Sequence, residues 1–140
     1  MIVNSSSLEA LQVEWDGVVR MRERMKLLVI ATFAGGAFTA PALANVVYNL
    51  PLLLAFDVLK QVLLQARDDG RFTCSLGQLR NLMDSAKVAL PWIDWESLRE
   101  GVRRRNEVAH DGMFFESTQC LDDIANIEAQ LVAWGIITAP

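Results

Sequence analysis

The stretch Asp94–Gly112 reads DWESLREGVRRRNEVAHDG and decides the fold class of the chain. Its apolar residues recur every three or four positions, which predicts a helix capped by Asp94 that runs to about Ala109. The apolar stripe consists of Trp95, Leu98, Val102 and Ala109. Arg105 and Asn106 interrupt this stripe, and burying an unpaired guanidinium there would cost roughly several kcal/mol. We therefore expect this end of the helix to open onto a polar cleft, a subunit interface or a ligand.

Helical spacing also recurs along the rest of the 140-residue chain, whereas the alternation typical of strands is nearly absent. We expect a first helix capped by Ser5–Ser7 and ending near Phe33, a second from Pro41 to Gly70 with a candidate kink at Pro51, a third from Ser75, and a last one capped by Ser117 or Thr118. The last helix carries an apolar stripe of Cys120, Ile124, Ile127, Leu131 and Trp134. These features predict an all-α antiparallel bundle of four to five helices, a single domain over residues 1–140.

The composition limits the classes of function. The net charge is −4 and the isoelectric point is near 4.9, which argues against a general nucleic-acid coat protein but leaves room for a local basic cleft. A single histidine excludes sites that need several in one chain. Cys74 and Cys120 lie far apart without ligand spacing, so we expect no zinc site, no disulfide and no cofactor. A reducing, cytoplasmic location fits best.

One long segment contains no charged residue. It covers residues 27–56, between Lys26 and Asp57, and a bilayer needs only about 20 apolar residues. Glycine, proline and asparagine interrupt it, as expected for two helices and a turn. We expect two buried core helices here and no membrane partner. A membrane-associated helical protein built on this segment remains the weaker alternative.

The residues that can carry chemistry gather at the end of the 94–112 helix. Asn106 and His110 are four residues apart, so the amide can orient the imidazole. Arg105 and His110 are five apart, or about 140° around an ideal helix. They converge only if the arginine reaches round the helix, if the helix unwinds near Asp111, or if a second subunit completes the site.

This stretch resembles the signature of HEPN domains, an arginine and a histidine separated by four residues with a polar residue directly after the arginine. Arg105, Asn106 and His110 match those positions. The resemblance implies a dimeric, HEPN-like bundle of four to five antiparallel helices in which two motifs face each other in a cleft. Many such domains are metal-independent endoribonucleases of toxin–antitoxin, phage-defence or RNA-processing systems. Others are inactive binding modules or partners of small nucleotidyltransferases.

In one group of toxins in this family, a tyrosine two residues after the motif histidine is modified by a nucleotidyltransferase antitoxin. Gly112 occupies that position here, and the only tyrosine is Tyr48, in another predicted helix. We therefore do not expect that particular form of regulation. An antitoxin or nucleotidyltransferase partner of another kind stays open.

The resemblance assigns a role in RNA cleavage to each motif residue. His110 would act as general acid or base, Arg105 would bind phosphate oxygens, and Asn106 would position the imidazole or a phosphate oxygen. A basic strip of Arg99, Arg103 and Arg104 would grip the RNA backbone. The leading prediction is thus a homodimeric, metal-independent endoribonuclease acting on RNA.

Structural interpretations of the same residues stay open. The chief rival is a non-catalytic HEPN module that dimerises or binds a protein, with the motif forming an interface network. His110 could simply interact with the helix dipole, and the arginines could be solvated or paired with Glu100 and Glu107. A carboxylate site built from Asp84, Asp94 and Glu96 is not favoured. Trp92 and Trp95 are expected to be core or interface aromatics.

Overall fold

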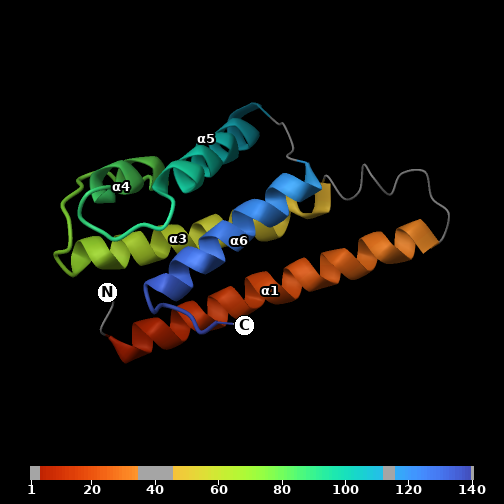
Figure 1. Ribbon diagram of the computed structural model, residues 1–140, viewed down its shortest axis with the longest axis horizontal. Helices are drawn as coiled ribbons and strands as arrows, with labels where there is room; N and C mark the ends of the chain where they lie inside the picture. Colours follow the sequence, from red (N-terminus) through yellow and green to blue (C-terminus); the bar gives the residue numbers. More distant parts are fainter. Residues whose placement is uncertain (1–3, 35–45, 112–115, 140) are drawn as a thin grey trace.

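The computed structural model describes residues 4–34, 46–111 and 116–139, and within the helices it leaves out the side chains of Phe33 and residues 108–111. The helices are α1 (Ser5–Ala34), α3 (Asn49–Asp68), α4 (Leu79–Ala86), α5 (Trp95–Asp111) and α6 (Ser117–Ala133) (Figure 1). No strand occurs in these three ranges. The predicted all-α helical bundle is confirmed.

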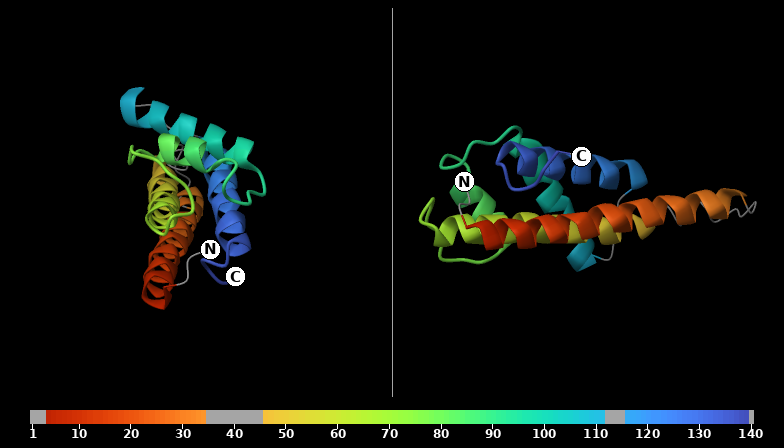
Figure 2. Two further views of the ribbon diagram at one scale, coloured as in Figure 1. Left: turned by 90° about the vertical axis from the view of Figure 1, so that its left-hand side faces the viewer. Right: turned by 90° about the horizontal axis from the view of Figure 1, so that it is seen from below.

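Helix α3 occupies the middle of the bundle. It packs against α1, α4 and α6, while α5 lies on α4 and α6. Figures 1 and 2 show that α1 and α3 run in opposite directions, whereas α5 lies across the other long helices, as the left view of Figure 2 shows. Helices α3 and α6 are not consecutive, yet they lie side by side and run in the same direction.

The central position of α3 follows from its sequence, which is apolar on most of its circumference. Phe56, Leu59 and Leu63 are completely or almost completely buried. Pro51 is the third residue of α3, where its missing N–H group leaves no helical hydrogen bond unmade. Residues 46 and 47 are also helical, and only the turn residue Tyr48, itself in the right-handed helical region, separates them from α3. The helical path is therefore interrupted three residues before Pro51, and a kink at Pro51 itself stays a prediction. The expected helix start after Pro41 lies outside the described residues.

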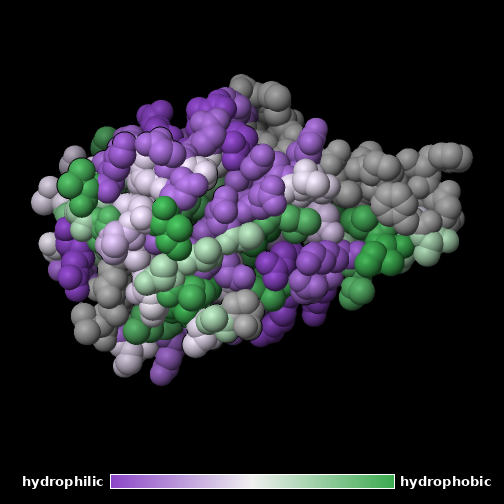
Figure 3. All heavy atoms as spheres, viewed as in Figure 1, coloured by the Kyte–Doolittle hydropathy of each residue, from purple (hydrophilic) through white to green (hydrophobic). Residues whose placement is uncertain are grey.

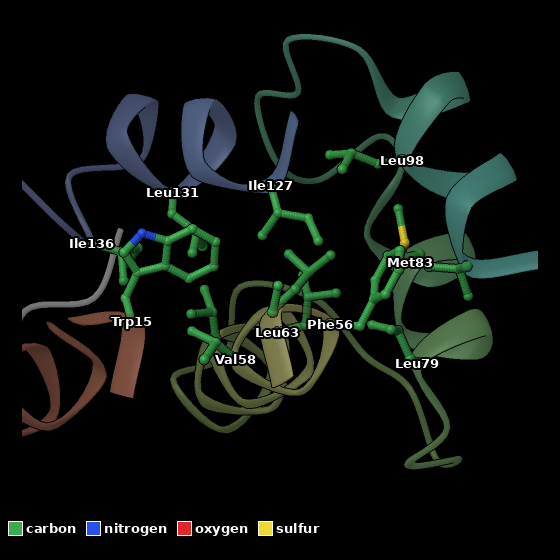
Figure 4. Close-up of a cluster of buried hydrophobic side chains, with 14 of the residues drawn as sticks. Trp15, Phe56, Val58, Leu63, Leu79, Met83, Leu98, Ile127, Leu131 and Ile136 are labelled. Carbon is green, nitrogen blue, oxygen red and sulfur yellow. The ribbon is translucent and has the colours of Figure 1, made fainter. Parts of the chain in front are cut away.

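Side chains from all five helices meet around α3 (Figure 4). Ile127 and Leu131 of α6 and Trp15 of α1 belong to the buried core, and so does the whole predicted stripe of α6. The indole Nε1 of Trp15 donates a hydrogen bond to Oε2 of Glu128 at 3.0 Å, which ties α1 to α6. The tryptophan rings of Trp92 and Trp134 meet edge to face, with centroids 4.7 Å apart.

The helix starts differ in detail from the sequence expectations. Asn4, and not the serines that follow it, caps α1, because its Oδ1 accepts a hydrogen bond from the Ser7 amide at 3.1 Å. Helix α4 begins at Leu79, four residues after Ser75, since Leu76 stays exposed and makes no helical turn. Glu116 occupies the N-cap position of α6, without a side-chain hydrogen bond to the helix.

The charge-free segment is buried only in part. Helix α3 is the one described helix that is long and apolar enough to cross a membrane, and 56% of its most apolar window is buried inside the fold, as in a core helix. The last two turns of α1 differ, because Leu27 and Ile30 are 66% and 63% exposed. They form the green end of α1 in Figure 3. The expectation of two buried helices is therefore right for α3 and wrong for the end of α1, which projects past its neighbours (Figure 1).

Candidate functional site

Helix α5 carries the motif, and its start is fixed locally. Asp94 accepts hydrogen bonds from the amide of Ser97 at 3.1 Å and from its hydroxyl at 2.6 Å, so the predicted cap is confirmed. Those hydrogen bonds, the hydroxyl's first, lower the pKa of the Asp94 carboxyl. Leu98 and Val102 are buried, and they turn one face of α5 toward the core.

Gly101 lets α5 approach its neighbours closely. A Cβ atom at this position would lie 3.1 Å from Cζ of Phe56 and 3.4 Å from Cγ of Asp123. Both of those side chains are buried and have little room to move. The glycine therefore allows α5 to lie close to α3 and α6 at this point.

Arg104 ties α5 to α6. Its Nη2 donates to Oδ1 and Oδ2 of Asp123 at 3.0 and 3.2 Å, and Gln119 Nε2 donates to the same Oδ1 at 3.0 Å. The Asp123 side chain is only 3% exposed. Burial raises the pKa of its carboxyl, while Arg104 and Gln119 act in the opposite direction. This arginine is thus a helix-to-helix link with part of its guanidinium at the surface.

The other two members of the predicted basic strip are also paired. Arg99 Nε donates to Oδ1 of Asp84 at 2.8 Å, which links α5 to α4. Arg103 is exposed and pairs within its own helix with Glu100 and Glu107, the intrahelical pairing that the sequence left open. These hydrogen bonds lower the pKa of Glu100 and raise that of Arg103. The strip is therefore largely neutralised by carboxylates.

Arg105 stands apart from these three arginines. Among the residues whose side chains the structure describes, it has no carboxylate partner. Its Nη1 donates to the Asn106 side-chain oxygen at a long 3.4 Å, and its buried Nε, like that of Arg104, has no hydrogen-bond partner. Both residues are half-buried. The two motif residues are thus adjacent and in contact, and among the described side chains Asn106 is the partner of the Arg105 guanidinium.

His110 belongs to α5, but its side chain lies outside the described residues, and so does the expected contact between its imidazole and Asn106. The 140° separation expected between positions 105 and 110 applies to the backbone of α5, which is helical through Asp111.

A cleft of about 340 Å³ lies between α5 and α6, beside the Arg104–Asp123 link. Four carboxylates line it (Glu96, Glu100, Asp122 and Asp123), against the one cation of Arg104. Such a lining repels phosphate, and Arg105 is not part of it. The described part of the chain contains no group of three His, Cys, Asp or Glu side chains that could hold a metal ion.

The structure adds two residues that the sequence analysis did not single out. Asp123 sits three residues after Cys120 and one before Ile124, so a carboxylate occupies a position on the apolar stripe of α6. A carboxylate in an apolar stripe indicates that a cation lies beside it, just as the cation Arg105 in the apolar stripe of α5 indicated a polar or charged partner. The sequence did not indicate a role for Gly101, because the need for a glycine inside a helix depends on which side chains of other helices pack against it.

Comparison with known proteins gives no further assignment: no family model, no curated protein and no solved structure matches this chain.

Proposed function

We propose that the protein is a homodimeric, metal-independent endoribonuclease of the HEPN type. The observation that carries the proposal is the state of Arg105. It is the only arginine of the 99–105 run without a carboxylate partner among the described side chains, and it lies in the helix that holds His110. A half-buried guanidinium without a carboxylate partner among the described side chains is suited to a phosphate group.

The chemistry needs only the residues of the motif. His110 of one subunit removes the proton from a ribose 2′-hydroxyl, whose oxygen attacks the neighbouring phosphorus. The bond from phosphorus to the 5′-oxygen breaks, and that oxygen takes a proton from an imidazolium. Arg105 stabilises the charge that develops on the phosphate oxygens. The products are a 2′,3′-cyclic phosphate and a 5′-hydroxyl end.

Two copies of the chain solve the shortage of histidines, since a dimer supplies one as base and one as acid. A dimer also removes the difficulty that Arg105 and His110 point to different sides of one helix, because the arginine of one copy can act at the same site as the histidine of the other. Asn106 positions the Arg105 guanidinium by accepting the hydrogen bond from its Nη1.

The basic strip acts less directly in this proposal. Arg99 and Arg104 keep their carboxylate partners and hold α5 in place. Arg103 is exposed, and its pairing with two glutamates of the same helix can be exchanged for an RNA phosphate at small cost. RNA binding should therefore weaken as salt rises.

A second candidate function is a non-catalytic HEPN module that binds a protein, such as an antitoxin or a nucleotidyltransferase. The charge distribution favours it: the chain carries a net charge of −4, and the cleft beside the motif helix is lined mainly by carboxylates. In this reading, Arg105 pairs with an acidic group of the partner.

The test is incubation of the purified protein with end-labelled RNA in excess EDTA, alongside Arg105→Ala, His110→Ala and Arg103→Ala. We expect the parent to leave cyclic phosphate ends. The first two variants should lose about 10²–10³-fold in rate. Arg103→Ala, the matched control, should lose affinity and salt dependence but keep most of its rate. Cleavage that survives in His110→Ala would contradict the assigned chemistry.

Mixed dimers test the composite site. Because the proposed site uses the histidines of both subunits, a heterodimer of a parent chain and a His110→Ala chain lacks either the base or the acid. It should be nearly as slow as the His110→Ala homodimer. A heterodimer that keeps about half of the parental rate, with subunit exchange demonstrated, would contradict the shared site and place each site within one chain. Inertness of the parent on all RNAs would favour the protein-binding module.

A further inference from the structure

The end of α1 presents an apolar surface, which we name the apolar tip. It consists of the exposed residues in the last two turns, Leu27, Leu28, Ile30, Ala31 and Ala34. Single exposed apolar residues are ordinary, but contiguous apolar surface on a soluble fold marks an interaction site. The tip projects beyond the other described helices (Figure 1), and in Figure 3 green spheres mark this end of α1.

The tip presents one broad apolar face. Leu27–Ala34 contains no charged residue, and its one hydroxyl is satisfied inside the helix, since Thr32 Oγ1 donates to the Leu28 carbonyl at 2.8 Å. At 100° per residue, the five exposed side chains fall within about 160° of the helix circumference, and Val29 on the opposite side packs against the core. An exposed apolar face of this width on a surface helix is suited to the interface of a lipid bilayer.

A basic segment lies directly behind the tip. Residues 20–26 hold four basic side chains and one acidic, a net charge of +3 in a chain of net charge −4. Glu23 is shared by Arg22 and Lys26, each at 3.3 Å. Arg20 and Arg24 are exposed and have no carboxylate partner among the described side chains, unlike the paired arginines of the 99–104 strip. We name residues 20–26 the basic collar.

We infer that the apolar tip inserts into the surface of an anionic lipid bilayer, with the basic collar among the headgroups. The charge complementarity is that of membrane-surface helices, in which basic side chains meet anionic lipids and apolar ones enter the acyl region. The eight residues Leu27–Ala34 extend about 12 Å, much less than the hydrocarbon core of about 30 Å. The tip therefore enters one leaflet and anchors the protein without spanning the membrane.

A second copy of the chain fits this surface less well. A twofold arrangement at the tip would bring two basic collars of the same sign together, which is unfavourable. The inference replaces the expectation of no membrane partner, which rested on burial of this segment, and it does not depend on ribonuclease activity.

The experiment is flotation of the full chain with vesicles, either of phosphatidylcholine alone or of equal parts phosphatidylcholine and phosphatidylserine. We expect binding to the anionic vesicles only, weakening as salt rises. The double variants Leu27→Glu/Ile30→Glu and Arg20→Glu/Arg24→Glu should each reduce binding about tenfold or more. The matched controls Val88→Glu and Arg80→Glu change side chains exposed elsewhere, and they should bind like the parent.

Each other outcome overturns the inference. Absence of the parent from the anionic vesicles would do so, as would undiminished binding of the tip variant. The oligomeric state is measured in parallel without lipid, by light scattering. A dimeric parent with a monomeric tip variant would show that a second copy covers the tip. Melting curves establish that the variants are folded, which their exposed positions favour.

Discussion

Replacing Gly101 by alanine tests the close approach of α5 to the core. Two effects oppose each other in this substitution. Alanine is the better helix former by about 0.5–1 kcal/mol in a helix interior. The new methyl group, however, meets Phe56 Cζ at 3.1 Å and Asp123 Cγ at 3.4 Å, and overpacking of this kind costs about 1–3 kcal/mol.

Gly17 provides the matched control. It lies inside α1, is exposed, and has no atom within 4 Å of where a Cβ would stand. Gly17→Ala therefore gains the helix preference without the clash, and we expect it to stabilise the protein by about 0.5–1 kcal/mol. Gly101→Ala should destabilise it by about 1 kcal/mol. The difference between the two variants isolates the packing cost.

Urea unfolding followed by circular dichroism measures both changes. At this chain length, 1 kcal/mol corresponds to about 3–4 °C in melting temperature, so thermal scans give a second reading. The two substitutions should move the midpoint in opposite directions. If Gly101→Ala stabilised the protein as much as Gly17→Ala, the close approach of α5 to Phe56 would be refuted.

Four further predictions concern buried and capping groups. Asp123→Ala should cost about 2–4 kcal/mol, and a double-mutant cycle with Arg104→Ala should show coupling, because the single change leaves the guanidinium without its partner. Burial raises the pKa of the Asp123 carboxyl, so the unfolded chain loses this proton at a lower pH than the folded protein does. Relative to Asp123→Asn, the free energy of unfolding of the parent should therefore fall as the pH rises from the unfolded-state pKa through the folded-state pKa. A rise would contradict the assignment. A thiol reagent at pH 8 should label Cys74 in the native protein and Cys120 only after unfolding, since burial raises the pKa of the Cys120 thiol to about 12; rapid labelling of both would refute this. Asp94→Ala should destabilise the fold by about 1 kcal/mol through loss of the helix cap, measured by urea unfolding, with no change expected if the cap is not formed in solution.

The sequence correctly predicted features that depend on residues close together in the chain. The Asp94 cap depends on a residue three positions away, and the stripe of α6 depends on spacing within one helix, so both could be read directly. Arg105 was recognisable as anomalous because a cation occupied an apolar stripe.

Contacts between helices could not be predicted in the same way. The partner of Arg104 is 19 residues further along, and it depends on how α5 and α6 are rotated against each other, which Gly101 helps to set. The prediction that the end of α1 is buried failed for a related reason. An apolar sequence predicts burial only if a neighbour is long enough to cover it, and the spacing of apolar residues in one helix contains no information about the reach of another.

The central place of α3 has a consequence for how the chain is made. Its parallel neighbour α6 leaves the ribosome only after the whole of residues 69–116 has been synthesised. At about 5–20 residues per second, that delay is roughly 2–10 s. During this interval α1, α4 and α5 can shield α3, the one described helix long and apolar enough to cross a membrane, but α6 cannot. Chaperones and membrane-targeting factors that sample emerging hydrophobic segments thus meet α3 before its last cover exists.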